Sequence, residues 1–334
     1  MNLPPLVRLL LWPLSVLYGG YVRARAWLYA NGWLKQRRLR GKVISVGNLT
    51  VGGTGKTPMV LWLAEKFLAE GKRVAILSRG YRGSAGTSDE IELMKHRLQD
   101  RVTFGVGKNR FAEGHRIESQ MPVDVFLLDD GFQHLSLARN LDILLMDASR
   151  PVHRSALLPA GSLREPVSAM SRADLLVFTR AETQPGSVEA ISKLGEYPVF
   201  AAVTRLVGFR LHGDAALLNS SEIGEGPFFA FCGIGNPEAF VHDLESWGIR
   251  VAGKMFFADH HRYTGADVRA LKSAAAAAGT KAFVSTEKDA HNLSDVKFAN
   301  RPVYVAVIDL EVKPEGDFLA AIDGILQAQP GATA

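Results

Sequence analysis

The chain has little of three things, and each shortage excludes a class of protein. Its 334 residues include a single cysteine, Cys232, so an internal disulfide framework and a cysteine-cluster metal site are excluded, and a reducing compartment fits. No internal repeat occurs, and no apolar run supports several membrane spans, which excludes a fibre and a polytopic membrane protein. The composition, 47% hydrophobic and 22% charged, is that of a globular protein long enough for two domains.

Acidic residues are missing from the first 40 positions, which hold seven of the 39 lysines and arginines. Removing these seven leaves 32 basic against 34 acidic residues, so the net charge of +5 belongs to the N-terminal segment. A nucleic-acid partner is therefore not expected, because the remaining chain has no surplus of positive charge to form a binding face.

The N-terminal segment is basic and aromatic. Between Arg8 and Arg23 lie 14 uncharged residues, about 21 Å as a helix against roughly 30 Å of hydrocarbon in a bilayer. Pro13 and the Gly19–Gly20 pair weaken a continuous helix, so a membrane-spanning helix is not expected. Aromatic side chains together with arginines suit the headgroup layer of an anionic membrane. The aromatic residues are Trp12, Tyr18, Tyr21, Trp27, Tyr29 and Trp33.

Two other interpretations of this segment stay open. A signal peptide would use Ala24-Arg25-Ala26 as a loose cleavage site, although the arginine inside it and the basic run after it argue against cleavage. Alternatively, the segment is a helix packed on the protein. We favour attachment to a membrane surface over residues 1–40.

From Lys42 onward, short apolar runs alternate with helical stretches, which predicts a parallel sheet covered on both faces. The expected fold class is α/β: a P-loop parallel-sheet domain over 41–205, a linker over 206–226, and a smaller α/β domain over 227–334 that closes the active-site cleft. The predicted strands are 42–47, 73–78, 123–130, 141–148, 173–180, 198–205, 228–234, 250–257, 281–286 and 303–308.

The segment NLTVGGTGKT (48–57) follows the first strand and leads into a helix. Its glycines let backbone N–H groups turn toward a phosphate, Lys56 is placed to reach the β- and γ-phosphates, and Thr57 to ligate Mg²⁺. The strict P-loop pattern has glycine where this chain has Thr50. A chance glycine turn is the alternative. The candidate nucleotide-binding residues are Thr50, Val51, Gly52, Gly53, Thr54, Gly55, Lys56 and Thr57.

Acidic residues close two of the apolar strands. Asp129 and Asp130 end the run VDVFLLDD, where a carboxylate would hold the metal of a bound nucleotide. Asp147 ends LDILLMDA and is interpreted as a turn residue. A P-loop and these carboxylates alone do not separate a kinase from a GTPase or a motor.

Taken together, the motifs resemble the tetraacyldisaccharide 4'-kinase family, the lipid A 4'-kinases of Gram-negative bacteria. The matching stretches are SVGNLTVGGTGKTP (45–58), LSRGYRG (77–83), LLDDGFQH (127–134), LLPAGSLREP (157–166), FCGIGNP (231–237), FADHHRYT (257–264) and STEKDA (285–290). The resemblance implies Mg²⁺-dependent transfer of the γ-phosphate of ATP to the 4'-hydroxyl of a tetraacyldisaccharide 1-phosphate, at the cytoplasmic face of the inner membrane. A substrate with four acyl chains stays in the bilayer, so such an enzyme must dock onto the membrane.

The resemblance also implies the site residues. Asp89 is the expected base. It is expected to form a hydrogen bond with a histidine of the other domain, His260 rather than His261. Lys56 is the third expected catalytic residue. Glu165 joins Thr57, Asp129 and Asp130 as an expected Mg²⁺ ligand. The expected substrate contacts are Arg79, Arg82, Gln133, His134 and Arg164. For Arg79 and Arg82, contact with nucleotide phosphates and a solvated loop are the alternatives. The stretch Thr286–Asp289 resembles a nucleotide-base motif at a strand end, with a purely structural role as the alternative.

Two other functions stay open. A membrane-associated P-loop ATPase or GTPase would use hydrolysis as a switch, although the position of Lys288 does not fit a guanine-selecting motif. A peripheral membrane protein that binds nucleotide only for stability would tolerate replacement of Asp89 or His260. No obligate protein partner is expected.

Overall fold

The computed structural model describes residues 4–80, 88–150, 152, 155–181, 197–293, 298 and 301–328. Contacts divide the chain into two compact units. The first comprises Met1–Arg82, Leu98–Val203 and Leu310–Ala334, and the second comprises Gly83–Arg97 and Thr204–Asp309. These limits differ from the predicted domains, since 83–97 and the predicted linker 206–226 belong to the second unit, and 1–40 and 310–334 to the first. The predicted break at 205 lies next to the boundary between Val203 and Thr204, which falls inside the strand β7 (Val199–Leu211).

The first unit is built on a parallel sheet, as predicted. Its strands lie in the order β3-β2-β4-β1-β5-β6-β7, and every neighbouring pair in that order is parallel. Besides β7, the strands are β1 (Lys42–Asn48), β2 (Val74–Ser78), β3 (Thr103–Val106), β4 (Val125–Asp129), β5 (Leu141–Asp147) and β6 (Leu175–Thr179). Parallel strands with both faces covered read as continuous apolar runs, which is why the sequence identified most of them.

Helices cover both faces of this sheet. The rings of Trp62 on α2 (Lys56–Ala69) and Phe318 on α9 (Glu315–Ala328) lie 5.7 Å apart, so these two helices share a face. On the other face, Ile117 of α4 (Arg110–Gln120) packs with Val43 and Leu128. Because α9 packs with α2 on this sheet, residues from 310 onward belong to the first unit.

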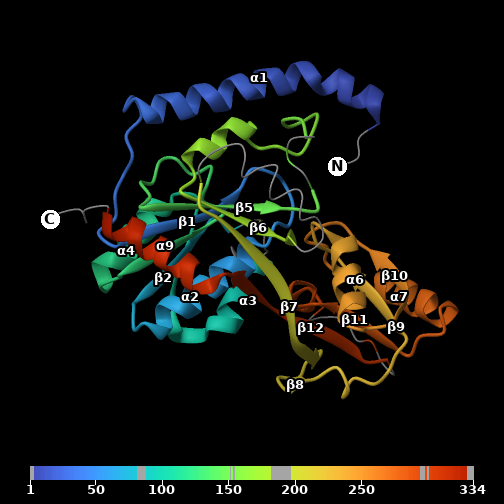
Figure 1. Ribbon diagram of the computed structural model, residues 1–334. Coiled ribbons are helices and arrows are strands. Elements are labelled where there is room, and N and C mark those ends of the chain that lie inside the picture. The colour runs from blue at the N-terminus through green and yellow to red at the C-terminus, as the bar shows by residue number, and fades with distance from the viewer. Residues whose placement is uncertain are drawn as a thin grey trace. The chain divides into compact units, whose positions relative to one another are not determined.

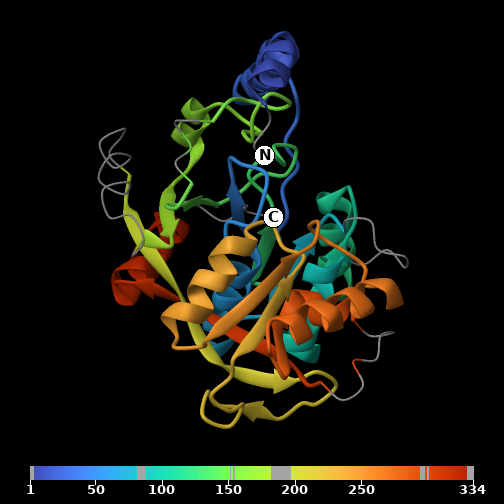
Figure 2. The same ribbon diagram turned by 90° about the vertical axis from the view of Figure 1, so that its right-hand side faces the viewer.

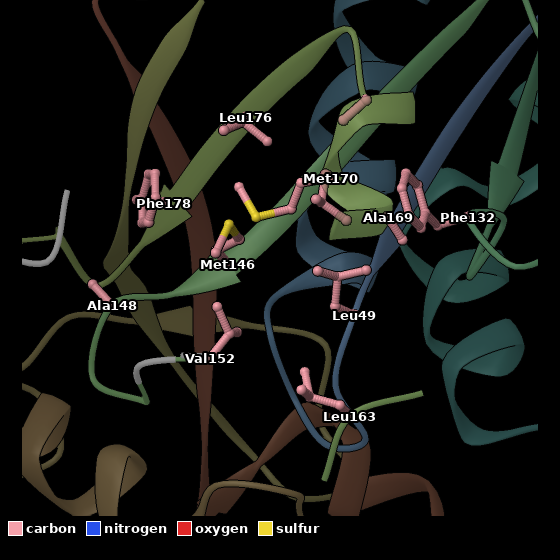
Figure 3. Close-up of a cluster of buried hydrophobic side chains, with 12 residues drawn as sticks. Leu49, Phe132, Met146, Ala148, Val152, Leu163, Ala169, Met170, Leu176 and Phe178 are labelled. Carbon is pink, nitrogen blue, oxygen red and sulfur yellow. The ribbon is translucent and has the colours of Figure 1, made fainter. Parts of the chain in front are cut away.

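A buried apolar cluster on the α4 side positions three of the sequence motifs. Leu49, Phe132 and Leu163 pack there with strand residues of β5 and β6 such as Met146 and Phe178 (Figure 3). Leu49 precedes the glycine loop, Phe132 follows the Asp129–Asp130 pair, and Leu163 precedes Arg164. One core cluster therefore fixes the loops that carry the predicted site residues.

The N-terminal segment forms a single helix, α1 (Pro5–Ala30), about 39 Å long at 1.5 Å per residue. The predicted helix runs without a break through Pro13 and the glycine pair, which were expected to weaken it. Proline removes one backbone donor among many, and Gly19 is buried against Leu157, where an added Cβ would lie 2.8 Å from the leucine Cδ1. Figure 1 shows α1 along the outside of the first unit, and Figure 2 shows it nearly end-on.

One side of α1 is bound to the first unit. The hydroxyl of Ser15 donates to the Leu157 carbonyl at 3.0 Å and accepts from the Ala160 amide at 3.0 Å. Tyr18 donates to the Arg164 carbonyl at 2.8 Å, and Arg25 donates to the Gln133 carbonyl at 3.1 Å.

The other side of α1 is exposed and apolar. Only Ser15 and Gly19 are buried in the helix. Among the described residues, α1 alone is long and apolar enough to cross a membrane. The large apolar side chains exposed on it are Leu6, Val7, Leu9, Leu10, Trp12, Leu14, Val16, Leu17, Tyr21 and Trp27.

The second unit has strands in the order β10-β9-β11-β12, again parallel. Alternate residues of β9 point to two clusters, with Phe228 facing α6 and Phe231 facing α7, and Figure 2 shows these helices on either side of the strands. The elements are α3 (Asp89–Leu98), β8 (Leu217–Leu218), β9 (Phe228–Cys232), α6 (Pro237–Ser246), β10 (Val251–Phe256), α7 (Gly265–Ala277), β11 (Ala282–Thr286), α8 (Glu287–His291) and β12 (Val303–Lys313).

Candidate active site

The glycine loop lies between β1 and α2, as its sequence predicts. Gly52 and Gly55 adopt positive φ angles of 114° and 82°, a conformation that side-chain-bearing residues avoid. The loop is held from two sides, since the Asn48 amide donates to Thr54 Oγ1 at 2.8 Å and Thr179 donates to the Thr54 carbonyl at 3.3 Å. Helix α2 begins at Lys56, so its positive end faces the loop.

The segment that carries Arg164 and Glu165 pairs directly with the start of this loop. The Val51 amide donates to the Ser162 carbonyl at 2.8 Å, and the Arg164 amide donates to the Leu49 carbonyl at 2.7 Å. These two bonds bring the LREP motif beside the glycine loop, although more than 100 residues separate the two in sequence.

Lys56 and Arg164 converge on Asp130. The Lys56 Nζ lies 3.6 Å from Oδ1 of Asp130, and Arg164 Nη1 lies 2.7 Å from its Oδ2. Burial by itself would raise the pKa of Asp130, but the charges of Lys56 and Arg164 outweigh it and hold this pKa below its ordinary value. Asp130 also has a φ of 50°, an uncommon conformation for a non-glycine residue that turns the chain sharply after β4.

Asp129 ends β4 and accepts a hydrogen bond from Ser78 at 3.2 Å. Glu165 is buried and ion-paired with Arg172 at 2.7 Å. Within the described residues, no group of three or more acidic, histidine or cysteine side chains could hold a metal ion.

Arg110 is a buried arginine that the sequence reasoning missed. It is 6% exposed at the first position of α4, and burial lowers its pKa against the opposing effect of Asp130 and Asp129, with Arg79 lowering it further. A cation at the positive end of a helix is unfavourable. That unfavourable position of the charge was the available signal in the sequence for Arg110.

The predicted substrate residues have different surroundings. The Gln133 amide donates to the Asn48 carbonyl at 2.9 Å, so it supports the end of β1. Burial and the charges of Arg110, Arg139, Arg25 and Arg79 lower the pKa of His134 to about 4, so His134 is neutral at pH 7. Arg82 lies outside the described residues.

Asp89 and His260 form a hydrogen bond within the second unit. The Nδ1 atom of His260 lies 3.1 Å from Oδ2 of Asp89, whereas His261 contacts Asp267 at 3.1 Å. The expectation that two domains contribute this pair is wrong, because Gly83–Arg97 belongs to the same unit as His260. The hydrogen bond to Asp89 raises the pKa of His260.

Burial would raise the pKa of Asp89 as well, but the hydrogen bonds from His260 and Asn292 outweigh it and lower that pKa. Asp89 is therefore ionised at neutral pH. The acidic start of α3 is consistent with its position at a helix N-terminus.

A strand, a glycine loop and a helix that begins with lysine and threonine, beside a strand that ends in aspartates, define a P-loop nucleotide-binding protein. Comparison with known proteins narrows the class. The family model Tetraacyldisaccharide-1-P 4'-kinase matches residues 7–327. The tetraacyldisaccharide 4'-kinase of Geobacter metallireducens is 39% identical and aligns with 96% of this chain and 99% of its own. The tetraacyldisaccharide 4'-kinase of Geobacter sulfurreducens is also 39% identical and aligns with 93% of this chain and 92% of its own.

A solved structure agrees with this result. The crystal structure of LpxK from Aquifex aeolicus, in its "apo" form in complex with ATP, is 31% identical with a TM-score of 0.76, over 96% of this chain and 99% of that one. The chain belongs to the tetraacyldisaccharide 4'-kinase family and is an enzyme of the kinase class.

Proposed function

We propose that this protein transfers the γ-phosphoryl group of ATP to the 4'-hydroxyl of a tetraacyldisaccharide 1-phosphate, a step in the synthesis of lipid A. Besides the family membership, the observation that carries this proposal is the convergence of Lys56 and Arg164 on Asp130 beside the glycine loop. Cations gathered around a carboxylate at a helix N-terminus suit the charge of a transferring phosphate.

The first unit binds ATP in this proposal. Backbone N–H groups of residues 50–55 and the positive end of α2 hold the phosphates, and Lys56 contacts the β- and γ-phosphates. Support for ATP comes from the Aquifex aeolicus relative, whose structure is described as a complex with ATP. Arg164 and Arg110 add positive charge where the phosphate moves.

Thr57, Asp129 and Asp130 would hold Mg²⁺, which when bound neutralises negative charge on the phosphates. Glu165 is paired with Arg172, which fits a position behind these ligands. Lys56 and Arg164 lower the pKa of Asp130 and so keep it ionised, the form that a metal ligand requires.

Asp89 is the base in this proposal. The 4'-oxygen forms a bond to the γ-phosphorus, the bond from phosphorus to the β–γ bridging oxygen breaks, ADP leaves, and the hydroxyl proton goes to the Asp89 carboxylate. His260 holds that carboxylate through the 3.1 Å hydrogen bond. A lowered pKa keeps Asp89 ionised, as a base must be.

Helix α1 docks the enzyme on the cytoplasmic face of the inner membrane in this proposal. Its exposed side carries large apolar side chains such as Trp12 and Leu17, 60% and 70% exposed. Its bound side is hydrogen-bonded at Ser15, Tyr18 and Arg25, positions that span about 15 Å of helix. A helix held to the protein along that length lies on the bilayer surface, with its apolar side toward the acyl chains.

The test is transfer of label from γ-labelled ATP to tetraacyldisaccharide 1-phosphate in detergent micelles with Mg²⁺. Lys56→Ala and Asp89→Ala are compared with two matched controls, Lys66→Ala on α2 and Glu92→Ala on α3, which remove surface ion pairs. Labelled lipid from the wild type and both controls, and none from the other two variants, is the expected result. Hydrolysis of ATP that needs Lys56 but labels no lipid would instead favour a switch ATPase.

A further inference from the structure

The segment Thr286–Asn292 includes α8 and the motif Thr286–Asp289, to which the proposed function assigns no role. It follows β11 in the second unit, and the Thr286 hydroxyl caps α8 by accepting from the Asp289 amide at 3.2 Å. Three of its side chains reach α3, the helix that begins with Asp89. These are Glu287, Lys288 and Asn292.

Asn292 fixes one oxygen of the Asp89 carboxylate. Its amide donates to Oδ2 at 3.0 Å, and His260 Nδ1 meets the same oxygen at 3.1 Å. Both hydrogen bonds end on Oδ2, so neither uses Oδ1. Two donors on one oxygen set the plane of the carboxylate and leave the proton of the sugar hydroxyl to Oδ1.

Lys288 contacts both His260, the other member of the pair, and α3. Its Nζ lies 2.8 Å from Oδ1 of Asp259, 3.2 Å from Oε1 of Glu90 and 3.5 Å from Nε2 of His260. Nε2 also lies 3.5 Å from Oε1 of Glu90, whose charge Lys288 balances at 3.2 Å. Because lysine has donors only, its contact with Nε2 favours the neutral ring in which Nε2 accepts and the proton is on Nδ1, directed at Asp89. The charge of Lys288 also opposes protonation of His260.

Asp289 holds the backbone beneath His260. It is 1% exposed and accepts from the Gly233 amide and from the Tyr263 hydroxyl, each at 2.8 Å. The carbonyl of Gly233 in turn accepts from the His260 amide at 3.2 Å. His260 has a φ of 62°, an uncommon conformation that persists only where the surroundings hold it.

Glu287 secures the far end of α3. Arg97, in the last turn, donates from Nε to Glu287 Oε1 at 3.0 Å, and both side chains are largely buried. The helix is thus held at its first turn by Lys288 and Asn292, and at its last turn by Glu287. All of these residues belong to the second unit.

We propose that Thr286–Asn292 is the positioning element of the Asp89–His260 pair, in which Lys288 sets the tautomer of His260 and Asn292 orients the Asp89 carboxylate. This proposal rests on the proposed function, because it takes Asp89 as the base. Neither Lys288 nor Asn292 is a ligand of ATP in it.

The first test compares Lys288→Met and Lys288→Arg with the matched control Lys254→Met, which removes an exposed lysine paired with Glu238 in the same unit. Besides Lys288, the charged groups near His260 are Asp89 and Glu90 on α3 and the neighbouring Asp259. In Lys288→Met the positive charge that opposes protonation of His260 is lost, while the nearby carboxylates remain. The fall of kcat at low pH, the acid limb of the profile, therefore moves to higher pH, by about one unit.

We expect kcat in Lys288→Met to fall between about tenfold and 100-fold, with the KM for ATP unchanged. Lys288→Arg restores the positive charge and returns the acid limb toward its wild-type position. Lys254→Met keeps the wild-type profile. A loss of fold would lower the amount of active enzyme but would leave the position of the limb unchanged.

The second test uses Asn292→Leu and Asn292→Asp. Leucine removes the donor to Oδ2 and lowers kcat with little movement of the acid limb. Aspartate has the same shape as asparagine but places a second carboxylate against Oδ2, so its kcat falls further. Should Lys288→Met fail to fold, this pair and Lys288→Arg decide the question.

Failure of the proposed function and failure of the positioning role give different results. Lipid phosphorylation that survives Asp89→Ala would remove the base assignment of the proposed function. Phosphorylation that needs Asp89, with kcat and the pH profile unchanged in Lys288→Met and Asn292→Leu, would overturn the positioning role and leave the proposed function intact.

Discussion

Nδ1 of His260 lies 3.1 Å from Oδ2 of Asp89, across 171 positions of sequence. The two residues belong to one compact unit, and the segment Thr286–Asn292 contacts both of them. The pair is therefore assembled within the second unit.

The pH dependence of turnover follows from this pair. The hydrogen bond to Asp89 raises the pKa of His260 above its ordinary value of 6.5. A protonated His260 makes Asp89 a weaker base, so activity falls as pH drops through that raised pKa. We expect the acid limb of kcat to lie above pH 6.5. His260→Ala should remove this limb and lower kcat about 100-fold, measured as initial rates across pH. A limb below pH 6 in the wild type would contradict the assignment.

Asp130 is the carboxylate that compensates the cations beside the glycine loop. In Asp130→Asn, Lys56 and Arg164 lose their partner, and the unfolding free energy should fall by about 2 kcal/mol. Because the phosphates of a nucleotide replace the lost negative charge, saturating ADP should raise the melting temperature of this variant more than that of the wild type. Thermal unfolding with and without ADP measures both. An equal ADP-induced shift in the two proteins would show that Asp130 does not face the phosphates.

Membrane attachment should depend on the exposed side of α1. Replacing Trp12 and Leu17 with glutamate removes two large apolar contacts, each worth about 2 kcal/mol when buried, and adds negative charge against an anionic surface. Sedimentation with anionic vesicles should recover at least about tenfold less of this variant. Val207→Glu is the matched control, since Val207 is 47% exposed on β7 and belongs to the second unit. Equal sedimentation of both variants would refute docking through α1.

Gly19 and Gly20 are neighbours in α1 with opposite surroundings. A Cβ at Gly19 would lie 2.8 Å from Leu157 Cδ1, whereas nothing lies within 4 Å of one at Gly20. Gly19→Leu should therefore push α1 away from Leu157, weaken the Ser15 hydrogen bonds and expose Arg23 and Arg25 to trypsin. Gly20→Leu should raise helix stability by about 1 kcal/mol and keep the helix protected. The rate of tryptic cleavage compares them, and equal rates would mean that α1 is not held at this point.

Local patterns predicted the glycine loop, Lys56 and the strand-end aspartates, because each depends on a few consecutive residues with a fixed geometry. The buried parallel strands were predictable for the same reason, since their apolar runs are continuous. The N-terminal helix was also predicted, but its contact with the first unit was not, because Leu157, which packs against Gly19, is far from it in the sequence. The roles of Lys288 and Asn292 beside Asp89 could not be predicted either. Both residues lie some 200 positions away in the sequence, and only the packing of the chain brings them to α3.

The segment 157–164 has α1 on one side and the glycine loop on the other. Ser15 and Tyr18 bind its backbone from the helix, and residues 49–51 bind it from the nucleotide side. In the proposed docking this strip of chain acts as a spacer of fixed thickness between the lipid surface and the phosphate being transferred. The height at which the enzyme works above the bilayer is then built into a few backbone hydrogen bonds, and a longer or shorter strip would place the phosphate at the wrong level for a sugar whose acyl chains are anchored below.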